Sequence, residues 1–71
     1  MVGRINALKL RRMIAGIKQH ELAEAAGMSE STLSKMETGR RYPTEEEARK
    51  LAKKLRCKPE RLMDLEDVVV P

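Results

Sequence analysis

The side chains best placed to do chemistry lie between Ser29 and Thr38, and the chemistry that they offer is hydrogen bonding. Leu33 and Met36 stand three residues apart, which predicts a helix with one apolar face. The other face is polar and carries Glu30, Ser31, Ser34 and Lys35, with Thr32 at its margin. Because lysine can donate to O6 and N7 of guanine and glutamate can accept from N4 of cytosine, this face could read the edges of bases.

Catalytic and metal-binding residues are scarce in the sequence. Cys57 and His20 are the only residues of their types, so neither an internal disulfide nor a four-ligand zinc site can form. His20 lies near Glu21 and Glu24, but no nucleophile accompanies them. We therefore expect no enzymatic activity, no metal and no cofactor. The fold should be held by apolar packing, which fits a reducing cytoplasm.

The charge and the aromatic content of the chain point to a polyanionic partner with a regular backbone. The net charge is +4 and the isoelectric point is 9.6. Single-stranded nucleic acids are usually held by stacking on aromatic side chains, and Tyr42 is the only aromatic residue. This composition favours backbone and groove contacts with duplex DNA.

No targeting or membrane segment is expected. No long apolar run follows Met1, and no apolar run, Val68–Val70 included, exceeds three residues, which is too short to cross a bilayer. We therefore expect a cytoplasmic, nucleoid-associated protein without a membrane segment.

Five helices and no strand are predicted to position the polar face. Gly16 and Gly27 should end the first and second helices, Thr44 and Glu47 form a capping box for the fourth, and Pro59 begins the fifth. The expected ranges are 4–15, 19–26, 29–38, 44–55 and 59–65. Residues 1–65 then form one domain, and residues 66–71 form a tail that is disordered or lies at an interface, pairing with another chain.

The second and third predicted helices have the features of a helix-turn-helix. Leu22, Ala23 and Ala26 form the inner face of the second helix. Two helices that cross steeply through a short turn need a residue that tolerates a positive φ, and Gly27 lies at that point. Ala23 provides the small side chain that a close crossing requires.

These residues resemble a known family. The run from Gln19 to Pro43 resembles the signature of lambda-repressor-like, Cro-family (XRE-type) helix-turn-helix domains, and the likeness covers roughly residues 5–65. The matching residues are Gln19, Leu22, Ala23, Gly27, Ser29, Leu33, Glu37, Gly39 and Pro43. The resemblance implies an all-α, compact five-helix domain that binds double-stranded DNA as a sequence-specific transcriptional regulator, a repressor. It also implies a homodimer on a pseudo-palindromic operator, with half-sites about 34–36 Å apart.

The resemblance implies roles for individual residues. Bases would be read from the third helix by Glu30, Ser31, Thr32, Ser34 and Lys35. The DNA backbone would be bound by Lys18, Gln19, Thr38, Arg40 and Arg41. Arg12 and Glu37 match an arginine–glutamate pair that ties the first helix to the end of the third. Arg56 departs from the family, which usually has glycine after the fourth helix.

An apolar stripe on the first predicted helix suggests a protein contact. Leu10, Met13 and Ile14 are spaced as one helix face, nearly opposite to Leu8. Our hypothesis is that this stripe contacts either the tail, at Val68, Val69 and Val70, or a second subunit. Two other functions stay open at this point: an antitoxin that represses its own operon and also binds a toxin, and a protein-interaction module without DNA binding.

Overall fold

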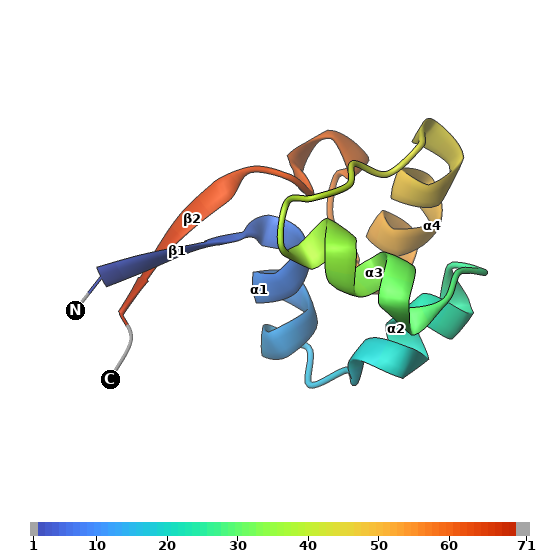
Figure 1. The fold of residues 1–71 in the computed structure, drawn as a ribbon, viewed down its shortest axis with the longest axis horizontal. Helices are drawn as coiled ribbons and strands as arrows, with labels where there is room; N and C mark the ends of the chain where they lie inside the picture. The colour runs from blue at the N-terminus through green and yellow to red at the C-terminus, as the bar shows by residue number, and fades with distance from the viewer. Residues whose placement is uncertain (1, 70–71) are drawn as a thin grey trace.

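Four α-helices form the body of the protein, and a two-stranded ribbon projects from it (Figure 1). The computed structural model describes residues 2–69. The elements in chain order are β1 (Val2–Asn6), α1 (Ala7–Ile14), α2 (Gln19–Ala25), α3 (Glu30–Glu37), α4 (Glu45–Leu55), the 3-10 turn η1 (Pro59–Arg61) and β2 (Leu65–Val69). The domain is therefore mostly helical, but the prediction that it has no strand is wrong. No helix among residues 2–69 has the length and hydropathy to cross a bilayer.

The start of α1 differs from the prediction, because the helix begins at Ala7 and not near residue 4. Asn6 is the N-cap, and its side chain accepts the N–H of Lys9 at 3.0 Å. The residues before it belong to β1, which pairs antiparallel with β2 from Val2 opposite Val69 to Asn6 opposite Leu65. The two strands come from opposite ends of the chain, so no local pattern in the sequence signals their pairing.

The fifth predicted helix is also shorter than expected. Only Pro59–Arg61 are helical, in a single 3-10 turn. The carbonyls of Leu62 and Asp64 accept the backbone N–H groups of Leu8 and Ala7, at 2.8 and 2.7 Å. These bonds join the segment after η1 to the start of α1. The chain then continues into β2 instead of extending the helix.

The other helix ends follow the predicted signals. Thr44 and Glu47 form the complete capping box at the start of α4, and Ser29 caps α3. Gly27 has a φ of +69°, the left-handed conformation that the turn between α2 and α3 requires. Arg56 takes the same conformation after α4, with a φ of 57°, although it carries a side chain.

The core lies where the four helices and the segment after η1 meet. Its fully buried side chains are Leu8, Leu22, Leu33, Met36, Leu51 and Leu62. Ala23 and Ala26 are also buried, so the predicted inner faces of α2 and α3 both point into the core. Because Leu33 and Met36 belong to this core, the orientation of α3 about its own axis is set by packing.

The apolar stripe of α1 stays open to solvent in the described part of the chain. Met13 is 56% exposed and Ile14 is 74% exposed, whereas Leu10 is partly buried. Val68 lies in β2 opposite Gly3 and so contributes to the ribbon. The side chain of Val69 and the whole of Val70 lie outside the described residues. The described part of the predicted tail therefore pairs with β1, and Met13 and Ile14 keep their exposure.

Candidate nucleic-acid interface

The third helix presents its polar side chains on a rigid support. Ser29 begins it: its hydroxyl accepts the N–H of Thr32 at 3.1 Å and donates to the hydroxyl of Thr32 at 2.9 Å. Leu33 and Met36 anchor the buried face, and the side-chain amide of Asn6 donates to the carbonyl of Met36 at 2.8 Å. Both ends of α3 are thus held by hydrogen bonds, which leaves the outer face in one orientation.

The five residues predicted to read bases all belong to α3 but differ in exposure. Glu30, Ser31 and Lys35 are exposed, whereas Thr32 and Ser34 are half-buried. The hydroxyl of Thr32 already accepts a hydrogen bond within the cap. The side chains that reach solvent most freely are therefore Glu30, Ser31 and Lys35, which can offer an acceptor, a hydroxyl and a cation.

The loop after α3 folds back onto the last turn of that helix. The hydroxyl of Thr38 donates to the carbonyls of Ser34 and Lys35, at 3.2 and 3.1 Å. The backbone N–H groups of Arg40 and Arg41 both reach the carbonyl of Lys35, at 2.9 and 3.3 Å. This loop brings the backbones of Lys35, Arg40 and Arg41 together at one end of α3, so three cationic residues cluster there.

The two loop arginines have different environments. Arg40 is exposed. Arg41 is partly buried, and its Nη2 contacts both carboxylate oxygens of Glu47, at 3.3 and 3.2 Å. Its Nη1 is buried without a hydrogen-bond partner in the described part of the chain. Arg40 is thus the freer of the two predicted phosphate ligands, and Arg41 joins the loop to α4.

The carboxylate of Glu47 should make the stability of the domain depend on pH. Hydrogen bonding to the backbone N–H of Thr44, together with Arg41, holds the pKa of Glu47 below its ordinary value of 4.5. A lowered pKa contributes stability above pH 4.5 that is lost as the pH falls through the folded-state pKa. We expect Glu47→Gln to lower the thermal midpoint at pH 6 and to lower it less at pH 3, where more of the wild-type carboxylate is protonated.

Thermal unfolding followed by circular dichroism between pH 3 and pH 6 checks this expectation. Glu45→Gln is the matched control, because it removes an exposed carboxylate from the same helical turn. An equal loss in Glu47→Gln at both pH values would show that its ionised form is not the stabilising one.

Arg12 and Glu37 form a buried ion pair beneath this surface. Arg12 Nε lies 2.6 Å from Glu37 Oε2 and Arg12 Nη2 lies 3.1 Å from Glu37 Oε1, which is a two-point contact. Arg12 Nη1 also donates to the carbonyl of Ile17 at 3.0 Å. The Glu37 side chain is only 3% exposed and that of Arg12 is 15% exposed. The pair ties the end of α3 to α1 and to the turn before α2.

The predicted phosphate ligands at the start of α2 lie beside this pair. The amide nitrogen of Gln19 donates to Glu37 Oε1 at 3.3 Å, and one N–H of that amide remains for another acceptor. Lys18 is the N-cap residue of α2 and is exposed, with no side-chain bond to the helix. Gln19 is thus joined directly to the end of α3, and Lys18 precedes it in the chain.

A groove beside the loop adds residues that the sequence did not single out. A cavity of about 450 Å³ separates the base of the ribbon from the end of α3. Arg4 and Lys9 line it from the N-terminal side, facing Thr38, Gly39 and the exposed Tyr42. Lys9 lies in the first turn of α1, and its proximity to Thr38 depends on how α1 packs against α3.

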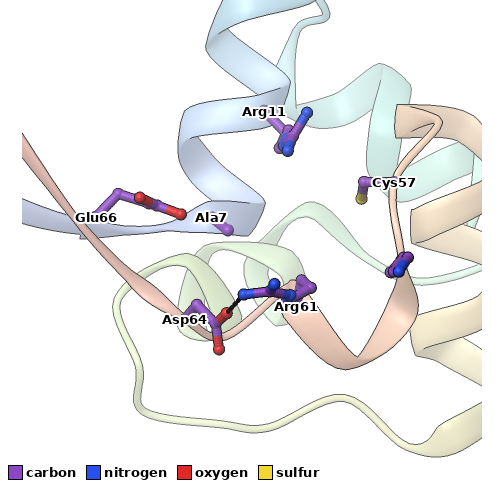
Figure 2. A pocket seen from close by; sticks show the side chains of 7 residues that line it. Ala7, Arg11, Cys57, Arg61, Asp64 and Glu66 are labelled. Carbon is purple, nitrogen blue, oxygen red and sulfur yellow. Dashed lines mark hydrogen bonds and ion pairs between the residues drawn. The ribbon is translucent and has the colours of Figure 1, made fainter.

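A second cavity, of about 390 Å³, lies between the start of α1, the segment around η1 and β2 (Figure 2). In Figure 2 Arg11 lies across from Cys57, and Arg61 forms an ion pair with Asp64 at 3.3 Å. Burial raises the pKa of the Cys57 thiol, although Arg11 opposes the effect. A thiol that stays protonated is a weak nucleophile. None of the predicted DNA-binding residues lines this cavity.

Comparison with known proteins agrees with this geometry. The sequence model of a family described as helix-turn-helix matches residues 8–62, which run from the first buried leucine of α1 to Leu62 after η1. No curated protein matches the chain. The match contains α2, the turn at Gly27, α3 and the loop that follows.

Proposed function

The chain belongs to the helix-turn-helix family, whose domains bind double-stranded DNA in transcription regulators, and from this we propose that it is a repressor that recognises a specific DNA sequence. One observation carries the proposal. The buried face of α3 is fixed by Leu33 and Met36, and its open face presents Glu30, Ser31 and Lys35 in one orientation. Such a preorganised face suits the reading of base edges.

Phosphate contact and base reading are assigned to different surfaces by their chemistry. Phosphates are contacted by Lys18, Gln19, Arg40 and Arg41, and these contacts set the position of the domain on the duplex. The outer face of α3 then enters the major groove. Lys35 and Arg40 are exposed cations whose backbones meet at one end of α3, and this supports a phosphate backbone as the partner over a role as a protein-interaction module. Two copies bind a pseudo-palindromic operator.

Selection of bound sequences from a random pool of duplexes tests the proposal. We expect recovery of an inverted repeat whose half-sites lie about one helical turn apart, on the order of 10 base pairs. Recovery of no preferred sequence would overturn sequence recognition, and recovery of a site without symmetry would overturn the dimer.

The exposed lysine of α3 provides the sharpest test of base reading. We expect Lys35→Ala to weaken binding to the selected operator by about 1–3 kcal/mol, with the loss confined to one base-pair position in each half-site. If Lys35 donates to a guanine, its removal weakens binding only to duplexes that carry that guanine at that position. Fluorescence anisotropy on the operator and on single-position variants measures the effect.

Arg40→Ala is the matched control, because this residue is a cation of similar exposure in the adjoining loop. It should weaken binding to all duplexes alike and reduce the slope of log affinity against log salt by about one unit. If Lys35→Ala behaves in the same way, Lys35 contacts phosphate and does not read a base.

A further inference from the structure

The ribbon of β1 and β2 is the part of the molecule least accounted for by the helix-turn-helix. It projects from one end of the body (Figure 1), and neither of its outer edges pairs with another strand within residues 2–69. A ribbon of only two strands is marginally stable by itself. An open edge also presents unpaired backbone N–H and C=O groups, which are a template for a further strand.

The register identifies the backbone groups that point outward. The N–H of Ala7 donates to the carbonyl of Asp64 at 2.7 Å. Ala7 and Asp64 continue the register of the two strands by one residue, so they form a bonded pair. Antiparallel ladders alternate between bonded and non-bonded pairs, so Ile5 with Glu66 is a bonded pair and Arg4 with Asp67 is not. The backbone groups of Arg4 therefore face the open edge of β1, and those of Asp67 face the open edge of β2.

Charge distinguishes the two edges. Glu66 and Asp67 make β2 acidic, so two copies of this strand side by side would bring four carboxylates together. The only charged residue of β1 is Arg4, and its guanidinium is paired with Asp67 across the ribbon at 3.2 Å. Gly3 adds no side chain that could keep a neighbouring backbone away. The β1 edge, with one cation that is already paired, is thus the one that meets its own copy with the weaker like-charge repulsion.

We propose that β1 pairs antiparallel with β1 of a second copy of this chain, in a four-stranded sheet with β2 on both outer edges. A two-fold axis then relates the copies, and each uses the same surface. This inference rests on the proposed function for its biological meaning, because it assigns the surface that makes the operator-binding dimer.

The dimensions of the molecule agree with this arrangement. The molecule is 35 Å long and 22 Å across. A ribbon of five residues is about 17 Å long, and the helical body makes up the rest of the length of the molecule. Copies joined along the ribbon carry their helical bodies at its two ends, with the centres of the bodies on the order of 35–40 Å apart. Successive half-sites on one side of the duplex are about 34–36 Å apart.

A pair of proline variants tests the proposal without DNA. Arg4→Pro removes the central outward N–H of β1, and Asp67→Pro removes the central outward N–H of β2. Both variants lose the Arg4–Asp67 ion pair, so they differ mainly in the edge that is blocked. We expect sedimentation equilibrium to show a dimer for the wild type and for Asp67→Pro. We expect Arg4→Pro to raise the dimer dissociation constant about 100-fold, since the two-fold axis removes two hydrogen bonds.

Several results would overturn the proposal: a monomeric wild type, an Arg4→Pro variant that dimerises like the wild type, or a monomeric Asp67→Pro. A monomeric Met13→Glu would assign the interface to the stripe of α1 and would overturn it as well. If Arg4→Pro fails to fold by circular dichroism, hydrogen exchange in the wild type decides. The amide of Arg4 should then gain protection with rising protein concentration and that of Asp67 should not, and an unprotected Arg4 amide contradicts the pairing.

Binding to DNA separates this inference from the proposed function. If the wild type binds the complete operator more tightly than a single half-site and Arg4→Pro loses this difference, both the inference and the proposed function stand. If the wild type forms the dimer through β1 but binds no duplex, the proposed function fails and the inference stands.

Discussion

Replacement of Arg12 by methionine should lower the free energy of unfolding by about 3–5 kcal/mol, the largest loss that we expect from any single polar residue. The carboxylate of Glu37 is 3% exposed and would keep only the amide of Gln19, at 3.3 Å, as a side-chain partner. A buried charge without its counter-ion is costly, because little solvent is available to replace the lost guanidinium. Urea unfolding followed by circular dichroism measures the loss.

The consequence for the whole domain should be severe. Small domains have total stabilities of roughly 5–15 kcal/mol, so Arg12→Met should be largely or partly unfolded at 37 °C. Since the pair joins the end of α3 to α1, the variant should also bind DNA weakly, in proportion to the fraction that remains folded.

Two controls distinguish a buried pair from an ordinary one. Arg49→Ala removes an exposed cation 3.8 Å from Glu45 and should cost no more than about 1 kcal/mol. In Arg12→Met combined with Glu37→Leu, much of the loss should be recovered, because apolar side chains can replace a buried ion pair. A loss in Arg12→Met no larger than that in Arg49→Ala would contradict a structural role for the pair.

Leu33→Ala should produce the second large effect, a loss of about 2–5 kcal/mol in the free energy of unfolding. Leu33 is fully buried and comes from the helix that carries the polar face. Removal of its side chain leaves a cavity where α3 meets the rest of the core, which costs both hydrophobic transfer energy and packing contacts. Denaturant unfolding measures the loss, and the slope m should stay unchanged.

Ser31→Ala is the matched control on the same helix. Ser31 is exposed, so its loss should change stability by no more than about 0.5 kcal/mol while weakening binding to the selected operator. The two variants then separate the two faces of α3. If Leu33→Ala and Ser31→Ala destabilise the domain equally, the assignment of inner and outer faces is wrong.

Local signals in the sequence predicted most of the helix-turn-helix. Glycine after α2, serine before α3 and the capping box of Thr44 and Glu47 each act within a few residues, so their effect does not depend on the rest of the fold. The apolar spacing of Leu33 and Met36 likewise predicted which half of α3 is buried. The family match over residues 8–62 agrees with these features.

Both ends of the chain differ from the predicted structure. The first helix was predicted to begin near residue 4, whereas it begins at Ala7, after the N-cap residue Asn6. The pairing of β1 with β2 joins residues 59 to 67 positions apart, from Asn6 opposite Leu65 to Val2 opposite Val69. The fifth helix was overestimated for the same reason, because the carbonyls after η1 bond to the start of α1.

The residues between Ser29 and Thr38 show what each level of structure decides. The sequence by itself determined that this stretch is a capped helix with an apolar and a polar face, because spacing and caps act locally. Only the tertiary structure decided which polar groups remain free: Arg41 meets Glu47, Gln19 meets Glu37, and Arg40 and Lys35 stay exposed. It also decided that the two chain ends form a ribbon. The contact of Gln19 with Glu37 and the pairing of β1 with β2 join residues that are far apart in the sequence, so their free energy is gained only when the chain is folded.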